Sequence, residues 1–141
     1  FNQVFGIDIS QIAISMAKTS CKEKNNCILV TGDVADDIFP EGTFDVVIDK
    51  GCLHSLDVDS RDSYIHNLGQ MLKIDGKVIL RAFNNDNDTS DFAGLPEGFT
   101  PHFYSKEELR SLFERRFNLI RYKRSEAKKF STDMYVFEKD Q

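Results

Sequence analysis

The chain has 141 residues, 40% hydrophobic and 29% charged, which is the balance of one soluble globular domain. No apolar run approaches the roughly 20 residues that cross a bilayer, so we predict no membrane partner. A net charge of -5 argues against nucleic acid as a partner, because non-specific binding needs a cationic surface. A local basic patch stays open, formed by Arg115, Arg116, Arg121, Lys123, Arg124, Lys128 and Lys129.

The cysteines and histidines show no spacing typical of a metal site. Cys21, Cys27 and Cys52 include no C-x-x-C pair, so they predict neither a disulfide framework nor a zinc site. Reduced thiols, and a start that lacks the basic region and apolar core of a signal peptide, predict a cytoplasmic location.

The first half of the chain predicts alternating strands and helices. We expect strands over residues 3–7, 27–31 and 44–49, the last with a nearly continuous apolar middle that suggests burial on both faces. Ser10 is a suitable N-cap for a helix after the first strand. The apolar positions of that helix repeat at helical spacing: Ile12, Ala13, Met16 and Ala17.

The middle of the chain continues this pattern. We predict a helix over residues 60–72, a turn at Asp75-Gly76 and a strand over 77–83. The apolar positions of the helix share one face: Tyr64, Ile65, Leu68, Met71 and Leu72.

The last part of the chain begins with a long polar stretch over residues 84–104, broken by glycines and prolines. Loops of that length are usually functional lids or disordered segments. Ser105 and Glu108 form a capping box that opens a helix. Strands over 117–124 and 134–139, joined by a short polar link, predict an antiparallel hairpin at one edge of the sheet.

Acidic residues lie at the carboxyl ends of three of the predicted strands. Asp8 follows the first, Asp33 lies two residues after the second, and Asp49 is the last residue of the third. Ligands of open α/β sheets bind outside the carboxyl ends of parallel strands, which share one edge. The sequence therefore predicts a ligand site at that edge, of the kind that binds nucleotides.

Strand and helix alternation followed by a terminal hairpin resembles the class I S-adenosylmethionine-dependent methyltransferases. The resemblance covers nearly all 141 residues. It implies an α/β, Rossmann-like, doubly wound and mostly parallel sheet that ends in an antiparallel hairpin, with S-adenosyl-L-methionine as the cofactor. Residues 49–54 and 103–109 most resemble the small-molecule branch that includes thiopurine and tellurite-resistance methyltransferases. The resemblance thus implies methyl transfer to a small-molecule substrate.

The resemblance also implies roles for residues after the first two predicted strands. Asp8 matches the family's acid that receives the ribose hydroxyls, a task that suits a carboxylate because it accepts two hydrogen bonds from a vicinal diol. Asp33 matches the acid near the adenine amino group. Ile9 and Val34 would flank the adenine ring.

Residues 44–54 match the family's fourth-strand motif, whose carboxyl end borders the transferable methyl group. Asp49, Lys50 and Gly51 are the candidate cofactor contacts there. Two interpretations of Asp49 stay open. Its carboxylate orients the cofactor or the acceptor, or it only accepts hydrogen bonds within the local turn. His54 is the best-placed candidate for a catalytic base, since imidazole titrates near neutrality. The alternative interpretation is that its side chain only caps the following loop or packs against it.

Three further residues are candidate substrate contacts. Cys52 follows the same strand, although a small buried hydrophobe is the alternative interpretation. His102 and Tyr104 lie in the long polar stretch. The alternative interpretations are that His102 is only exposed to solvent and that Tyr104 only packs at the start of the next helix.

The family's first strand and its Gly-rich loop have no match in this sequence. We therefore interpret residues 1–141 as a single, N-terminally truncated methyltransferase domain whose isolated form binds cofactor weakly and is inactive. Without that central strand, the strands that end at Asp8 and Asp49 have no common neighbour.

Two other functions stay open. A non-catalytic cofactor-binding or scaffolding domain would keep the same fold. An NAD(P)-dependent oxidoreductase of the short-chain type needs a Tyr and a Lys four residues apart on a helix. The one match, Tyr135 and Lys139, falls on a predicted strand, where the two side chains lie roughly 13 Å apart.

Overall fold

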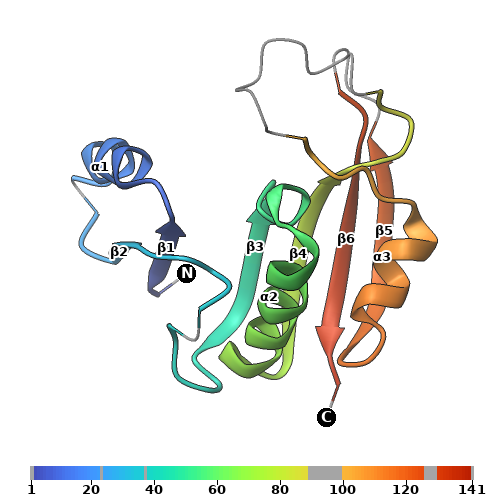
Figure 1. Ribbon diagram of the computed structural model, residues 1–141. Helices are drawn as coiled ribbons and strands as arrows, with labels where there is room; N and C mark the ends of the chain where they lie inside the picture. The colour runs from blue at the N-terminus through green and yellow to red at the C-terminus, as the bar shows by residue number, and fades with distance from the viewer. Residues whose placement is uncertain (1, 23, 37, 89–99, 126–129, 141) are drawn as a thin grey trace. The chain divides into compact units, whose positions relative to one another are not determined.

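The computed structural model describes residues 2–22, 24–36, 38–88, 100–125 and 130–140 (Figure 1). The chain divides into two units, Phe1–Ile38 (unit 1) and Phe39–Gln141 (unit 2). Each is described by itself. Most of the predicted stretch over 84–104 lies outside the described residues.

Unit 1 is a strand, helix and strand in that order: β1 (Val4–Asp8), α1 (Gln11–Ser20) and β2 (Cys27–Thr31). β1 and β2 pair in parallel, with Asp8 opposite Thr31, so α1 is the crossover that a parallel pair requires. The side chain of Ser10 accepts a 3.2 Å hydrogen bond from the backbone N–H of Ala13. The predicted strands, the helix and its N-cap are thus confirmed.

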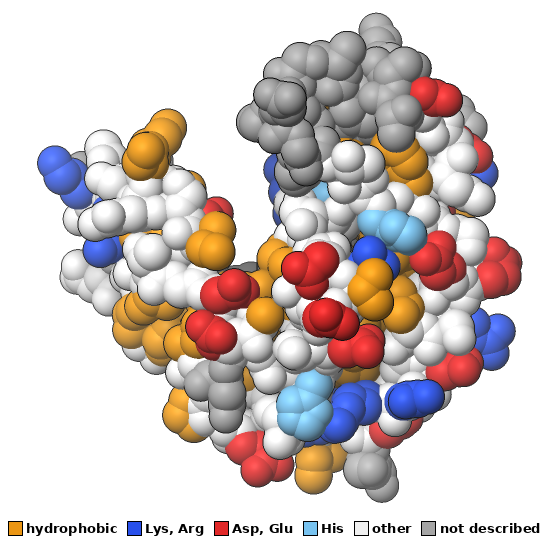
Figure 2. Space-filling model, viewed as in Figure 1, with side chains coloured by type: hydrophobic (Ala, Val, Ile, Leu, Met, Phe, Trp, Pro, Cys, Tyr) orange, Lys and Arg blue, Asp and Glu red, His pale blue; other side chains and the backbone are white. Residues whose placement is uncertain are grey.

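The buried face of α1 differs from the prediction. Ile14 is buried, whereas Ile12 and Met16 are 75% and 68% exposed. Figure 2 shows hydrophobic side chains at the surface of unit 1. Ala13 and Ala17 are half-buried on the same side as Ile14, because positions three and four apart share a helix face. The apolar positions of the helix belong to two faces, and only one of them is buried.

Unit 2 carries a four-stranded sheet with the strand order β3-β4-β6-β5. β3 pairs with β4 in parallel, and β6 pairs antiparallel with both β4 and β5. This confirms the α/β class and the C-terminal antiparallel hairpin. The elements are β3 (Phe44–Lys50), the 3-10 helix η1 (Leu53–Ser55), α2 (Val58–Met71), β4 (Leu72–Phe83), α3 (Lys106–Phe113), β5 (Phe117–Ser125) and β6 (Thr132–Lys139).

Side-chain caps set the starts of α2 and α3. The carboxylate of Asp57 accepts from the N–H of Ser60 at 2.8 Å, so α2 begins two residues before its predicted start. The hydroxyl of Ser105 accepts from the N–H of Glu108 at 3.1 Å, as the capping box predicts. Each bond satisfies one of the backbone donors that a helix leaves unpaired at its start.

The core of unit 2 lies between one face of this sheet and the helices α2 and α3 (Figure 1). Alternate residues of β4 and β6 point into it, including Leu80, Tyr135 and Phe137. The ring of Phe113 on α3 stacks on Phe137 at 4.3 Å. The prediction that β3 is buried on both faces is wrong, since Ile48 is 63% exposed.

The predicted turn at Asp75-Gly76 is an irregularity inside β4. The strand begins at Leu72, before the predicted start, and Asp75 has a φ of 61°. A Cβ atom on Gly76 would lie 2.7 Å from the carbonyl oxygen of Lys73, which is closer than real contacts allow. Glycine therefore permits the local backbone approach at this point.

Candidate functional site

The carboxyl ends of β1 and β2 bring Asp8 and Asp33 to one edge of the unit 1 sheet. The backbone carbonyl of Asp8 accepts a 3.1 Å hydrogen bond from the N–H of Gly32, so the two strand ends are adjacent. Oδ1 of the exposed Asp8 accepts from the N–H of Ser10 at 2.7 Å. Oδ1 of the half-buried Asp33 accepts from the N–H of Ala35 at 2.9 Å.

This edge combines hydrogen-bond acceptors with apolar surface. Oδ2 of Asp8 has no hydrogen-bond partner among the described residues. Ile9, the next residue, is 73% exposed, and Val34 after Asp33 is half-buried. A carboxylate with a free oxygen beside apolar side chains fits a ligand that carries a diol next to a flat apolar ring.

In unit 2, the carboxylate of Asp49 organises the turn after β3. Oδ1 accepts from the N–H of Cys52 at 2.7 Å, and Oδ2 accepts from the N–H of Leu53 at 3.0 Å. The hydroxyl of Tyr64 on α2 donates to the same Oδ2 at 2.9 Å. Asp49 is buried, so these three donors offset the cost of burying its charge. The turn role that the sequence left open is therefore present, and its contact with a cofactor stays a prediction.

The other predicted residues of this turn differ in exposure. Lys50 is exposed and Cys52 is half-buried. Gly51 has a φ of 109°, a conformation that side chains rarely adopt. A Cβ atom there would lie 3.2 Å from Cε1 of His54, so Gly51 also leaves room for that ring.

The imidazole of His54 is buried in η1 and packs on Phe83, with ring centroids 4.2 Å apart. Its Nδ1 atom is buried and has no hydrogen-bond partner among the residues that the structure describes. Burial lowers the pKa of His54, and the negative charge of Asp49 opposes this shift in part. A neutral imidazole with an unsatisfied ring nitrogen is suited to accept a proton or a hydrogen bond.

His102 and Tyr104 lie beside this turn in unit 2. The N–H of His102 donates to the carbonyl of His54 at 2.8 Å, and its Nε2 lies 2.7 Å from Oε1 of Glu108. The Tyr104 side chain is fully buried, and its hydroxyl donates to the carbonyl of Leu53 at 3.4 Å. Burial raises the pKa of Tyr104 to about 12. Its predicted contact with an acceptor gains no support from this buried position.

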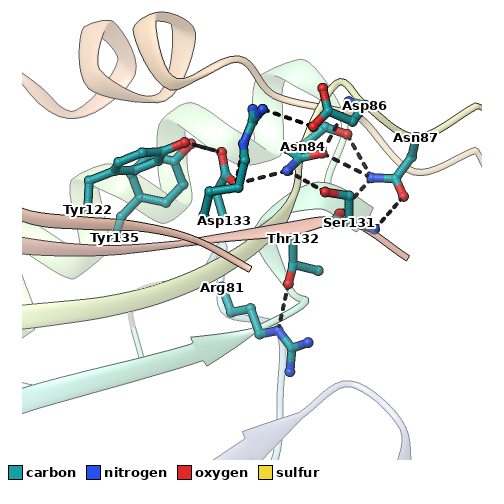
Figure 3. Close-up of polar contacts among 10 residues, drawn as sticks. Arg81, Asn84, Asp86, Asn87, Tyr122, Ser131, Thr132, Asp133 and Tyr135 are labelled. Atoms are coloured by element: carbon teal, nitrogen blue, oxygen red, sulfur yellow. Dashed lines mark hydrogen bonds and ion pairs between the residues drawn. The ribbon is translucent and has the colours of Figure 1, made fainter. Parts of the chain in front are cut away.

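A polar network beyond the end of β4 was not predicted from the sequence (Figure 3). The buried carboxylate of Asp133 accepts from Nδ2 of Asn84 at 2.8 Å and from the Tyr122 hydroxyl at 2.8 Å. Asn84 also donates to Oγ of Ser131, and the amide of Asn87 bonds both backbone groups of Ser131. The one available signal was that Asp133 shares the inward face of β6 with apolar residues.

The contacts of Tyr135 and Lys139 can be compared with the alternative function of a short-chain dehydrogenase. Tyr135 and Lys139 both lie on β6, where the Tyr135 hydroxyl is bonded to Asp133 and the Lys139 ammonium to the carbonyl of Leu72. They are therefore not the helical Tyr and Lys pair of a short-chain dehydrogenase. Among the described residues, no three His, Cys, Asp or Glu side chains are grouped so that they could hold a metal ion, and no helix is long and apolar enough to cross a membrane.

Comparison with known sequences finds a matching family model and curated relatives. The family model described as "Methyltransferase domain" matches residues 1–76. Two curated Schizosaccharomyces pombe proteins, both named uncharacterized methyltransferases, are 41% identical to this chain over 87 residues. Each match covers 60% of this chain and 59% of the relative, so the chain spans well under two thirds of those proteins.

Solved structures show the same fold at low sequence identity. A SAM-dependent methyltransferase from Methanosarcina mazei matches 98% of this chain and 82% of its own length, with a TM-score of 0.82 and 20% identity. The 1,6-didemethyltoxoflavin-N1-methyltransferase of Burkholderia thailandensis, solved with 1,6-didemethyltoxoflavin and S-adenosylhomocysteine bound, matches 99% of this chain and 62% of its own length. Its TM-score is 0.78 and its identity 19%. The predicted Rossmann-like fold is confirmed.

Proposed function

The chain belongs to the methyltransferase-domain family, as a class I S-adenosylmethionine-dependent methyltransferase, and we propose that it transfers a methyl group from S-adenosylmethionine to a small-molecule acceptor. The observation that carries the proposal is the pair of acids Asp8 and Asp33 at the adjacent carboxyl ends of β1 and β2. Parallel strands of this fold bind nucleotide ligands at that edge.

We propose that unit 1 holds the adenosyl part of the cofactor. Oδ2 of Asp8 accepts hydrogen bonds from the ribose hydroxyls, while Oδ1 keeps its bond to the N–H of Ser10. Asp33 accepts from the adenine amino group, and the apolar side chains of Ile9 and Val34 flank the ring. The bound cofactor supplies a methyl group on a positively charged sulfur.

In unit 2 we propose that Asp49, Lys50 and Gly51 line the cofactor side of the turn. Methyl transfer needs aligned reactants and the exclusion of water more than it needs catalytic side chains. Where the acceptor loses a proton, His54 receives it, because burial keeps the imidazole neutral near pH 7. Cys52, His102 and Tyr104 are the proposed residues on the acceptor side.

The proposal of a small-molecule acceptor is supported by the similar structure of the 1,6-didemethyltoxoflavin-N1-methyltransferase, which was solved with 1,6-didemethyltoxoflavin bound. We also propose a cytoplasmic location, which the three free cysteines support. Finally, we propose that a strand outside these residues completes the fold. Within the described residues, β1 pairs only with β2, and β3 only with β4.

Calorimetric titration of S-adenosylmethionine and S-adenosylhomocysteine into the protein, with any residues that precede it in its natural sequence, tests the cofactor site. Asp8→Asn keeps an oxygen that can accept from the N–H of Ser10 but removes the charge that the ribose hydroxyls would meet. We expect the dissociation constant to rise at least about tenfold in this variant. Asp62→Asn, at an exposed position of α2, is the control and should bind as the wild type does.

Transfer of a tritiated methyl group to cell-extract metabolites then tests the reaction. Labelled small molecules would support the enzyme, whereas cofactor binding without any transfer would favour a non-catalytic domain of the same fold. Equal binding by the wild type and Asp8→Asn would refute the assignment of the ribose site. The titration uses the folded protein with any residues that precede it in its natural sequence. If this protein does not bind the cofactor, the proposed function is overturned.

A further inference from the structure

Unit 1 contains a pair of cysteines that the methyltransferase site does not use. The Sγ atoms of Cys21 and Cys27 lie 3.0 Å apart, and the Cys27 thiol is the hydrogen-bond donor to Cys21. Both cysteines are free thiols and both are half-buried, so small molecules in solution can reach them. From this geometry we propose that Cys21 and Cys27 are a site of reversible oxidation, which forms an intrachain disulfide by exchange with a low-mass disulfide of the glutathione class.

The backbone holds the two sulfur atoms in place from both sides. Cys21 is the C-cap of α1, where its N–H donates to the carbonyl of Ala17 at 3.0 Å. Its own carbonyl accepts from the N–H of Lys24 at 2.8 Å, which turns the chain back toward β2. Cys27 is the first residue of β2, opposite Val4 of β1. Both ends of the short link are therefore anchored in regular structure.

Closure requires only a small local movement. A disulfide has an S–S distance of about 2 Å, so the sulfur atoms must approach by about 1 Å. Rotation about the side-chain bonds of two half-buried residues can supply this approach without moving α1 or β2. The third cysteine, Cys52, lies in unit 2 and provides an internal control.

The exchange balances as two displacement steps. The Cys21 thiolate attacks one sulfur of oxidised glutathione and releases one glutathione thiolate, which takes up the proton that Cys21 lost. Cys27 then loses its proton and attacks the Cys21 sulfur of the mixed disulfide, so the second glutathione leaves. Two protein thiols are oxidised to one disulfide, and one oxidised glutathione is reduced to two thiols.

Nearby groups affect the reactivity of this pair. The hydrogen bond to Cys21, and to a lesser extent burial, raises the pKa of the Cys27 thiol, while the positive charge of Lys24 opposes the shift. Cys27 therefore stays a protonated donor while Cys21 attacks, and becomes the resolving thiol only after the mixed disulfide has formed. For this reason we assign the first attack on glutathione to Cys21.

Equilibration of the reduced full chain with mixtures of oxidised and reduced glutathione tests the site. Acid quenching, alkylation and mass spectrometry of peptides then report each cysteine separately. We expect the peptide with Cys21 and Cys27 to lose two hydrogen atoms, with Cys52 still alkylated or carrying glutathione. The equilibrium constant for closure should be at least about tenfold larger in the folded chain than in concentrated urea, where only local chain closure contributes.

Variants separate the two steps. In Cys27→Ser, Cys21 should stop at the mixed disulfide with glutathione, whereas Cys52→Ser should leave closure unchanged. Far-UV circular dichroism checks that each variant is folded. The proposal is overturned if closure is equally favourable in the folded chain and in urea, or if Cys21 and Cys27 each carry a separate glutathione in the folded wild type.

Discussion

The side-chain amide of Asn84, just after β4, donates a 2.8 Å hydrogen bond to the buried carboxylate of Asp133 on β6. The same Nδ2 atom donates to the hydroxyl oxygen of Ser131 at 2.8 Å. This amide thereby joins the end of β4 to the start of β6 (Figure 3). The last residue of β4, Phe83, packs on the ring of His54. The buried carboxylate needs these donors because it cannot be hydrated.

Asn84→Ala removes both of these hydrogen bonds and leaves a buried carboxylate with fewer donors. We expect the free energy of unfolding to fall by about 1–3 kcal/mol, measured by urea unfolding followed by far-UV circular dichroism. Asn85→Ala, at the exposed neighbouring position, should change it by less than about 0.5 kcal/mol. Equal effects of the two substitutions would show that the network around Asp133 does not stabilise unit 2.

Tyr64→Phe tests the turn role of Asp49. The substitution removes the hydroxyl that donates a 2.9 Å hydrogen bond to Oδ2 of Asp49, and it keeps the ring in the core. Because the acceptor is a buried carboxylate, we expect a loss of about 1.5–3 kcal/mol in the free energy of unfolding. Urea unfolding measures the loss, and calorimetric titration measures S-adenosylmethionine affinity in the same variant. Unchanged stability would mean that the two N–H donors of Cys52 and Leu53 suffice for Asp49.

Local signals in the sequence predicted most of the elements. The caps at Ser10 and Ser105 depend on residues three positions apart, so the chain itself contains the complete signal. The order of strands and the terminal hairpin followed from apolar runs and from the family resemblance. The acids Asp8 and Asp33 were predicted because each lies at or just beyond the carboxyl end of a strand.

Interactions between distant residues could not be predicted in this way. Asn84 and Asp133 are 49 positions apart, and no local pattern links them. The contact between Cys21 and Cys27 could not be predicted because their spacing matches no metal or redox motif, and only the fold of unit 1 brings the sulfur atoms together. The helix α1 has apolar residues on two faces, and their spacing alone does not determine that the face with Ile14 is the buried one.

A pair of glycine substitutions tests the fit between Gly51 and His54. Both Gly51 and Gly42 have positive φ, at 109° and 64°, so alanine strains the backbone at either position. A Cβ atom at Gly51 would also press on the His54 ring at 3.2 Å, whereas at Gly42 it would meet nothing within 4 Å. We expect Gly42→Ala to cost about 1 kcal/mol of unfolding free energy and Gly51→Ala more than this.

Nuclear magnetic resonance can separate the two contributions at Gly51. The imidazole signals of His54 should shift in Gly51→Ala and stay in place in Gly42→Ala, because only the first substitution touches the ring. If the His54 signals are unchanged in both variants, the close approach of Gly51 does not position the imidazole. The cost of Gly51→Ala would then come from its φ alone.

The burial of His54 predicts a loss of stability in acid. Burial lowers the pKa of His54 below its usual value of 6.5, against the opposing charge of Asp49, so the folded state disfavours the protonated ring. A group with a lowered folded pKa contributes its full stabilisation above pH 6.5, and this contribution is lost as the pH falls from there through the folded pKa. Urea unfolding between about pH 5 and pH 8 measures this dependence, which should be weaker in His54→Gln. Titration of the His54 ring protons at or above pH 6.5 in the wild type would contradict the prediction.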